Sequence, residues 1–346
     1  MKSKILAIGI ILVMLLTMFT GCSSEDENKG NATEDVNFDK KVELTWAMAG
    51  TRGVGSGCAV DKLSEMLEER TNGAITVNCI DGGALGNDAE LVNQLIDGTV
   101  DVVSTSIGTV TAYYEPLGSI QTPFLIDSYD DEYQVIQSGE WKALVEAANS
   151  AMGGARIMAT TENGMRHFAF SDKLCTTVAD LAKTKIRTGG SDVVNKAIRA
   201  IGANPTTIPM TETFSALQNG IVDGMEINYA MISMMSFYEV INSVSEVNMY
   251  PWVTFELMSE STIESLPEGY YEVIQQCFDD FQTWWWTEGL STWADEAKQD
   301  CVDNGVEIVE FQEIDKIKEL CEAIYDKTVA SDEKAAALIE FAQGIK

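Results

Sequence analysis

Hydrophobic and polar positions change period repeatedly along the chain, from the alternation typical of strands to the spacing typical of helices. Between residues 58 and 70 the apolar residues Val60, Leu63 and Leu67 recur at helical spacing, and a Thr-Asn-Gly sequence that suits a left-handed cap follows. The elements expected in the first half are strands over 42–47, 74–79 and 100–103 and helices over 58–70 and 88–96. Strands that alternate with helices in this way predict βαβ units and a mostly parallel sheet.

The second half of the chain repeats this order. Its expected elements are strands over 155–159, 184–187 and 221–227 and helices over 192–201 and 212–218. The sequence L-x-x-G-x-V-D occurs at 95–101 and again at 217–223, each time where a helix should end and a strand begin. Two ordinary helix-to-strand turns of similar chemistry would explain this as well as two related α/β lobes would. Two such lobes would enclose a cleft at the carboxyl ends of their strands, where open α/β sheets bind ligands.

The C-terminal part is predicted to be helical apart from a strand over 306–309. A long helix is expected from the Ser-Leu-Pro-Glu sequence at 265–268 to Asn304 and Gly305, and helices over 314–327 and 332–342 follow. The long helix carries three consecutive tryptophans, Trp284 to Trp286, which span most of a turn and cannot share one face. We expect them to be packing residues rather than a carbohydrate-stacking site.

Composition narrows the range of partners. The 346 residues include 54 Asp and Glu against 23 Lys and Arg, and 45% of the chain is hydrophobic. The apolar content supports a packed core and excludes a disordered acidic chain. The acidity argues against nucleic acid as a partner, because phosphate binding needs clustered Lys and Arg. A small anion could still bind at a few arginines, and the chain has six: Arg52, Arg70, Arg156, Arg166, Arg187 and Arg199.

The N-terminus indicates export. Two lysines precede the apolar run 5–19, which has the length of a secretory signal and is short for a membrane-spanning helix. The residues before Cys22 resemble a bacterial lipoprotein cleavage site, so we expect residues 1–21 to be a signal peptide and Cys22 to be lipidated. A plain secretory signal with an incidental cysteine is the alternative. Residues 22–41, which are largely polar, are expected to be a flexible tether. We therefore expect an extracytoplasmic protein anchored to the outer face of the cytoplasmic membrane, or a periplasmic one.

The sequence lacks the common motifs of catalysis and metal binding. His167 is the only histidine, and no G-x-S-x-G, H-E-x-x-H or C-x-x-C sequence is present. The glycine-rich segment 50–57 lacks the G-K-[ST] ending of a phosphate-binding loop. We therefore expect no catalytic residue, no metal and no cofactor. The six cysteines after Cys22 could form disulfides or remain free thiols, and the sequence favours neither.

One part of the chain carries a specific resemblance. It comprises G-M-R-H-F at 164–168, D-L-A-K-T-K-I-R-T at 180–188 and A-I-G-A-N-P-T-T-I-P-M-T-E-T-F-S-A-L-Q-N-G-I-V-D-G-M-E-I-N at 200–228. These sequences resemble the substrate-binding proteins of tripartite ATP-independent periplasmic (TRAP) transporters, the dicarboxylate-binding-protein family. Similar segments at 68–77, 84–103, 237–240 and 266–274 extend the resemblance over residues 42–310.

The resemblance implies an α/β fold of the periplasmic-binding-protein type. Its two lobes would enclose an interlobe cleft, and a long C-terminal helix would span both. Residues 42–163 and about 253–292 would form the first lobe, and residues 164–252 and about 293–346 the second.

The resemblance also implies that arginine recognises the ligand. Arg187, in the K-I-R sequence, stands at the family's carboxylate clamp, where a planar guanidinium can make two parallel hydrogen bonds that lysine cannot. Arg166 stands at the second cationic contact of many members. A surface ion pair in this acidic protein is the alternative for either arginine.

Four further residues fall at ligand positions of the family. Asn228 lies one place after the position of a ligand-binding asparagine, and Met210 replaces an aromatic residue that covers the ligand in some members. Asp88 and Ser106 are at cleft-lining positions of sialic-acid-binding members. An acidic residue is usual where Ser106 stands, which argues against sialic acid for this chain.

The sequence therefore predicts a monomeric solute-binding protein that closes its lobes on a small organic acid, a sugar acid or a dicarboxylate. It would deliver this ligand to the membrane permease subunits of a TRAP transporter and would not be an enzyme. A secreted carbohydrate-active enzyme and a ligand sensor for a membrane receptor are the alternative functions.

Overall fold

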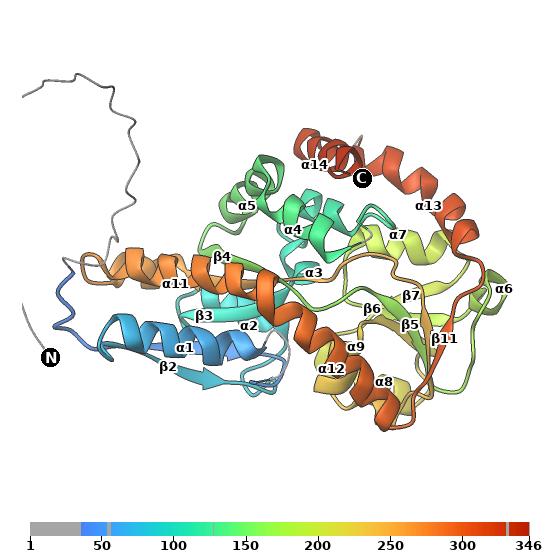
Figure 1. The fold of residues 1–346 in the computed structure, drawn as a ribbon, viewed down its shortest axis with the longest axis horizontal. Helices are drawn as coiled ribbons and strands as arrows, with labels where there is room; N and C mark the ends of the chain where they lie inside the picture. The colour runs from blue at the N-terminus through green and yellow to red at the C-terminus, as the bar shows by residue number, and fades with distance from the viewer. Residues whose placement is uncertain (1–35, 54–56, 127, 330–331, 346) are drawn as a thin grey trace, which may run out of the picture.

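The computed structural model describes residues 36–345 except residues 54–56, 127 and 330–331. The expected signal peptide and Cys22 lie outside the described residues. No helix in the described part of the chain is long and apolar enough to cross a membrane. Two sheets lie side by side, each with helices against it, and one long helix runs across both (Figure 1).

The first lobe is built on a five-stranded sheet of order β2-β1-β3-β10-β4. Its strands are β1 (Val42–Met48), β2 (Ile75–Ile80), β3 (Val102–Ser106), β4 (Ala155–Glu162) and β10 (Val253–Ser259), and its helices are α1 (Cys58–Arg70), α2 (Asp88–Ile96), α3 (Ile107–Val110), η2 (Glu115–Gln121), α4 (Tyr129–Gln137), α5 (Gly139–Met152) and α10 (Glu260–Ser265). β1 is parallel to β2 and β3, as the βαβ pattern predicts. β10 arrives from the far half of the chain and is antiparallel to β3 and β4, so the sheet is mixed.

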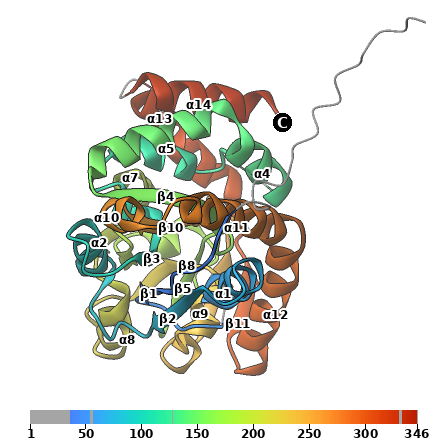
Figure 2. The ribbon, with the colours of Figure 1, turned by 90° about the vertical axis from the view of Figure 1, so that its left-hand side faces the viewer.

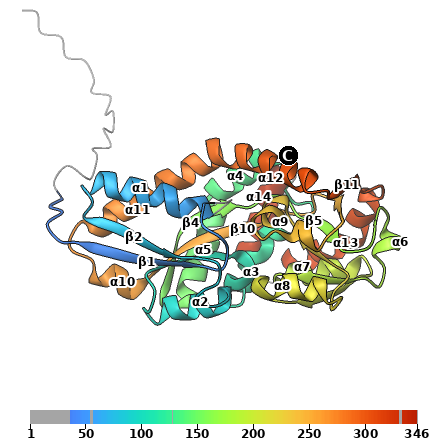
Figure 3. The same ribbon diagram turned by 90° about the horizontal axis from the view of Figure 1, so that it is seen from below.

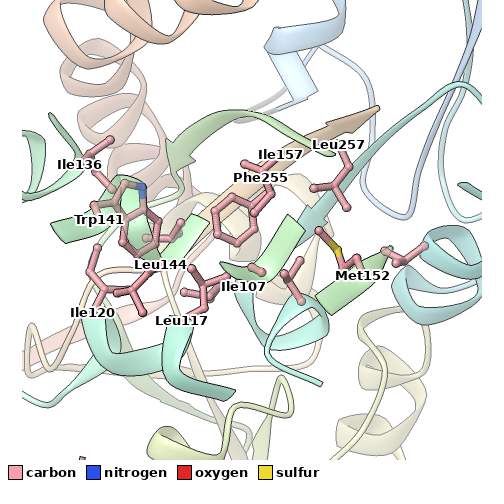
Figure 4. Packing of buried hydrophobic residues seen from close by; sticks show 14 of the residues in the cluster. Ile107, Leu117, Ile120, Ile136, Trp141, Leu144, Met152, Ile157, Phe255 and Leu257 are labelled. Atoms are coloured by element: carbon pink, nitrogen blue, oxygen red, sulfur yellow. The ribbon is translucent and has the colours of Figure 1, made fainter. Parts of the chain in front are cut away.

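One core of this lobe lies between the sheet and helices α5 and η2. Phe255 of β10 stacks against Trp141 of α5 there, and Leu257 of β10 joins the same core nearer Met152 (Figure 4). These side chains are buried, and each large apolar side chain of this kind stabilises the fold by about 1.5–3 kcal/mol when removed from water. The core fixes β10 beside β3, and this pairing builds one wall of the site described below.

The second lobe is built on a six-stranded sheet of order β11-β9-β5-β8-β6-β7. Its strands are β5 (His167–Phe170), β6 (Lys185–Thr188), β7 (Asn204–Thr207), β8 (Gly224–Ile227), β9 (Ser243–Glu246) and β11 (Glu307–Glu310), and its helices are α6 (Val178–Leu181), α7 (Asp192–Ala200), α8 (Met210–Gln218), α9 (Tyr229–Met234) and η3 (Phe237–Glu239). β6 is parallel to β7 and β8, whereas β5 is antiparallel to β8 and β9. The strand expected to start at residue 221 starts at Gly224, since the N–H groups of Gly220 and Ile221 still donate to carbonyls of α8.

The two copies of L-x-x-G-x-V-D have the same structure. Gly98 and Gly220 both adopt positive φ, near 72° and 64°, and end helices α2 and α8. The aspartate of each copy then holds the neighbouring strand: Asp101 Oδ2 accepts the Thr45 N–H at 2.8 Å, and Asp223 Oδ2 accepts the Lys185 N–H at 2.8 Å. The repeat therefore marks equivalent positions of two lobes built on one plan, which resolves the alternatives that the sequence left open.

The long helix begins later than predicted. Gly269 adopts a left-handed conformation, with φ near 81°, so the helix starts at Tyr270 rather than near Pro267. It runs as α11 (Tyr270–Trp284), a π-helical turn η4 (Trp285–Gly289) and α12 (Leu290–Asp303). α11 packs on the first lobe and α12 packs against α9 of the second, so the helix spans both lobes as expected.

The tryptophan run is a packing feature, as predicted. Trp285 is buried, and its Nε1–H donates to the Glu162 carbonyl at 3.2 Å. Trp286 donates to the Thr160 carbonyl at 3.0 Å. Both bonds tie the π-helical turn to the end of β4, at the boundary between the lobes.

The last two helices, α13 (Ile314–Val329) and α14 (Glu333–Gly344), lie along one side of the molecule (Figure 2). α13 packs against α7 of the second lobe, but α14 packs against α5 and η2 of the first. Leu338 and Ile339 of α14 join the same core as Trp141. The predicted division, which places 293–346 with the second lobe, does not anticipate this return of the chain. The six cysteines in the described part of the chain are free thiols.

Candidate functional site

A cavity of about 410 Å³ lies between the two lobes. Its walls come from the carboxyl end of β3 and the starts of α2 and α3 in the first lobe, and from the ends of β6 and β7 and the start of α8 in the second. Figure 3 shows α2 and α8 approaching each other from the two lobes. The position matches the expectation that the ligand site lies at the carboxyl ends of the parallel strands.

Arg187 is the one cationic side chain among the described residues that line this cavity. It is 3% exposed; its Nε donates to the Ile208 carbonyl at 2.9 Å, and its Nη1 has no hydrogen-bond partner. Burial lowers the pKa of Arg187 to about 10, so it stays cationic at neutral pH. A buried guanidinium with an unused donor is costly unless an anion completes its shell. The geometry therefore suits binding of a carboxylate.

Asp88 lies in the first-lobe wall of the same cavity as Arg187. It is the first residue of α2, whose preceding residue Asn87 caps the helix with its side chain. Burial raises the pKa of Asp88 to about 6, and the nearby Arg187 opposes this increase. At neutral pH Asp88 is therefore mostly ionised and can accept hydrogen bonds from hydroxyl groups of a ligand.

Ser106 and Met210 also line the cavity, and their contact with a ligand stays a prediction. Ser106 is the N-cap residue of α3, yet its side chain makes no capping hydrogen bond, so its hydroxyl is available to a ligand. Met210 begins α8 and forms an apolar section of the wall together with Met231, Met234 and Trp252. Thioether and indole surfaces of this kind adapt to the nonpolar face of a ligand.

Arg166 is buried behind the wall and does not line the cavity. It is 0% exposed, and its Nε donates to Glu226 Oε2 at 2.5 Å while Nη2 donates to the Glu226 carbonyl at 2.6 Å. Its guanidinium also lies 4.0 Å from the ring centroid of Trp252, which does line the cavity. Arg166 thus supports the wall in this structure, and a direct contact with ligand stays a prediction.

Asn228 is likewise outside the cavity wall. Its Oδ1 accepts the Met231 N–H at 2.9 Å, which caps α9, and its Nδ2 donates to the Gly164 carbonyl at 3.2 Å. Both side-chain functions are therefore used within the protein. His167, the only histidine, is buried, and its pKa is lowered to about 4, mainly by burial. It is neutral at physiological pH and its Nδ1 accepts backbone N–H groups of Val247 and Asn248.

Sequence reasoning missed Ser104 and the residue behind it, Glu256. Ser104 lines the cavity, and its Oγ shares a hydrogen bond of 2.5 Å with Glu256 Oε2. A signal was present in the sequence, because Glu256 is the single charged residue in the otherwise uncharged run Tyr250–Ser259. No group of three or more His, Cys, Asp or Glu residues suited to a metal ion occurs in the described part of the chain.

Comparison with known proteins gives a family match over most of the chain. Residues 50–332 match the family described as bacterial extracellular solute-binding protein, family 7. A sequence relative is the uncharacterized protein y4mM of Sinorhizobium fredii, 28% identical over 232 residues, which are 67% of this chain but only 42% of that protein.

Solved structures share the fold. The sugar acid binding protein DctPAm from Advenella mimigardefordensis, in complex with galactonate, is 24% identical with a TM-score of 0.84, covering 89% of this chain and 99% of the other. A TRAP periplasmic solute-binding protein from Shewanella oneidensis with bound succinate is 24% identical with a TM-score of 0.80, covering 87% and 98%. These structures confirm the two-lobed fold.

Proposed function

Because the chain belongs to family 7 of the bacterial extracellular solute-binding proteins, we propose that it captures a small organic acid for a TRAP-type membrane transporter. Membership of this family confirms the resemblance found in the sequence and the interpretation as an extracytoplasmic binding protein rather than an enzyme. The acid is a sugar acid or a dicarboxylate, the two kinds of ligand bound in the similar structures from Advenella mimigardefordensis and Shewanella oneidensis.

The observation that carries this proposal is the unpaired donor of Arg187. A cation that is 3% exposed, with an unpartnered Nη1, lines a cavity large enough for a small organic acid. A ligand carboxylate would accept hydrogen bonds from Arg187 and neutralise its charge away from water, where such bonds are strongest. Closure of the lobes around the pair would be favoured by the ligand because only the closed state makes both sets of contacts.

Asp88 favours the sugar acid over the dicarboxylate. A carboxylate on the opposite wall accepts hydrogen bonds from hydroxyl groups, whereas a second ligand carboxylate there would be repelled. In the orientation we propose, the carboxylate of the ligand binds Arg187 and its hydroxyl groups bind Asp88 and Ser106. Met210 packs on the apolar side of the carbon chain. Arg166 and Asn228 support this wall from behind, through Trp252 and the start of α9.

The remaining parts of the proposal concern the location of the protein, its partner subunits and the boundaries of its lobes. We propose that Cys22 carries a lipid anchor, that residues 1–21 are removed, and that the monomer passes its ligand to the permease subunits. The lobes would be divided near residues 163 and 252, where the chain crosses between the two sheets. Val36 and Phe38, at the end of the proposed tether, pack against the first lobe beside Tyr270.

The direct experiment is a thermal-shift screen of organic acids with purified protein. D-galactonate is expected to raise the melting temperature more than succinate, because a ligand that binds only the native state stabilises it. The variant Arg187→Met is expected to melt normally and to show no shift with either acid. If neither sugar acids nor dicarboxylates shift the wild-type protein, the proposed ligand class is wrong.

A further inference from the structure

A buried carboxyl group lies directly behind the first-lobe wall of the cavity. Glu256 is 0% exposed and stands opposite Ser104 in the antiparallel pairing of β10 with β3. Ser104 lines the cavity, and its hydroxyl is hydrogen-bonded to Glu256. The two side chains share the face of the sheet that carries Trp46.

The Ser104 hydroxyl makes two hydrogen bonds within the protein and keeps one further donor or acceptor for a ligand. Trp46 Nε1–H, which can only donate, donates to Ser104 Oγ at 2.8 Å. The other bond joins Ser104 Oγ to Glu256 Oε2 at 2.5 Å. A hydroxyl has one hydrogen and two lone pairs, so the direction of the bond to Glu256 decides what remains. If Ser104 donates to Glu256, Ser104 Oγ keeps one unused lone pair; if Glu256 donates to Ser104, the Ser104 hydrogen stays free to donate to a ligand.

Glu256 has no cationic partner among the described residues. No ion pair forms to it there, and its Oε1 has no hydrogen-bond partner in the same part of the chain. Burial raises the pKa of Glu256 to about 8, and the bond from Ser104 opposes this only in part. Glu226 differs from Glu256 in this respect, because this buried carboxylate forms an ion pair with Arg166.

We propose that Glu256 is a positioning residue of the organic-acid site, which as an uncharged acid donates its proton to Ser104 and turns the Ser104 hydroxyl into a donor toward the ligand. This proposal rests on the proposed function. A donor suits the oxygens of an anionic ligand, and a neutral Glu256 does not repel it. Ionisation of Glu256 releases its proton to solvent, reverses the Ser104 bond and places a negative charge behind the wall. Ligand binding therefore favours the protonated form, and affinity falls as Glu256 ionises.

Other titratable groups near the site must be separated from this effect. In the cavity these are Asp88 and Arg187, with pKa values of about 6 and about 10. On the face of the sheet that carries Trp46, helices α1 and α11 contribute Cys58 and Cys277, whose pKa values are raised by burial. Glu162, at the end of the neighbouring strand β4, has a pKa of about 7. Only a variant of Glu256 itself isolates its contribution.

The test compares Glu256→Gln with the matched control Glu260→Gln. Glutamine keeps position 256 neutral and can donate to Ser104, whereas Glu260, four residues along the chain, forms a half-exposed ion pair with Arg156. Binding of D-galactonate and of succinate is measured by calorimetry at about pH 7 and about pH 9, both above the pKa of Asp88. Wild type and Glu260→Gln are expected to lose about five- to tenfold in affinity between the two values, and Glu256→Gln to lose less than about twofold.

Each outcome decides between the two proposals. An equal fall in affinity for Glu256→Gln and wild type, or a wild-type affinity that does not change with pH, overturns the role of Glu256 and leaves the proposed function standing. Failure of both acids to bind the wild type overturns the proposed function and this proposal with it.

Melting curves without ligand add an independent check. A neutral Glu256 in the fold ionises on unfolding, so the melting temperature of Glu256→Gln relative to wild type should rise from about pH 5 to about pH 8. A constant difference contradicts the proposal.

Discussion

The two lobes share one plan but place different chemistry at equivalent positions. The aspartates that hold β1 and β6, Asp101 and Asp223, align the lobes residue by residue. At equivalent positions the first lobe has Ala47, Asp88 and Ser104 where the second lobe has Arg187, Met210 and Glu226. The second lobe thus carries the cation that faces the cavity, and the first lobe carries hydroxyl and carboxyl groups.

The second lobe also contains two buried arginines that differ in their partners. Arg166 shares Glu226 with the hydroxyl of Tyr250, which donates to Glu226 Oε2 at 2.7 Å. Each arginine has an Nη1 without a hydrogen-bond partner in the described part of the chain, but only Arg166 forms an ion pair there. The difference teaches that burial alone does not identify a ligand-binding cation. A buried charge that is already paired is satisfied within the protein, and one left unpaired at a cavity is the better candidate for contact with a ligand.

The strongest test of this contrast is Arg166→Met. Removing one partner leaves Glu226 buried without its cation, so we expect the free energy of unfolding to fall by about 3–5 kcal/mol in urea titrations. Arg156→Met, which breaks the half-exposed pair with Glu260, is the control and should cost no more than about 1 kcal/mol. A loss of affinity at unchanged stability would instead assign Arg166 to the ligand.

Arg187→Met should show the opposite result. No ion pair is broken, so the free energy of unfolding should change by less than about 1 kcal/mol, while affinity for the organic acid falls at least about tenfold. Calorimetry and urea titration of the same preparations measure the two effects. Arg187→Lys retains the charge but not the planar fork, and should recover only part of the affinity. Wild-type affinity in Arg187→Met would remove this residue from the site.

Asp88→Asn tests the opposite wall. Without the carboxylate, succinate should bind several-fold better and galactonate several-fold worse, each by about 1 kcal/mol. The pKa of Asp88 near 6 adds a pH effect with a defined sign. Below pH 6 wild-type Asp88 becomes neutral, so succinate should bind wild type more tightly at about pH 5 than at about pH 7, and Asp88→Asn should lose this change. Unchanged selectivity in competition experiments would contradict the proposed orientation.

The smallest expected effects compare the equivalent N-cap positions Ser106 and Asn228. Asn228 caps α9, so Asn228→Ala should lower the free energy of unfolding by about 1 kcal/mol. Ser106 makes no capping bond, so Ser106→Ala should leave stability unchanged and weaken ligand binding by a few-fold. Equal stability losses in the two variants would show that Ser106 is a structural cap after all.

The sequence predicted most of the elements because their signals are local. Helices over 58–70 and 88–96 have the predicted bounds, since apolar spacing and the following glycines or asparagines determine where such helices end. The pairing of β10 with β3 and the return of α14 to the first lobe depend on contacts between distant segments, which no local pattern encodes.

The residues of the candidate site also divide into those that a local sequence signal identifies and those that depend on contacts between distant segments. Four of the predicted ligand-binding residues line the cavity, which is compatible with the roles that the resemblance implies: Arg187, Asp88, Met210 and Ser106. The sequence could not show that Arg166 is already paired, because its partner Glu226 is 60 residues away along the chain. Ser104 and Glu256 escaped notice for a similar reason: 152 residues separate them, and only the β3–β10 pairing brings them together.

The π-helical turn of the long helix has a mechanical consequence. Its tryptophans are tied to the end of β4 in the first lobe, while α12 beyond it packs on α9 of the second. Closure of the lobes on a ligand, as proposed above, would therefore bend the long helix, and we expect the bend at the π-helical turn, whose backbone bonding is looser than that of an α-helix.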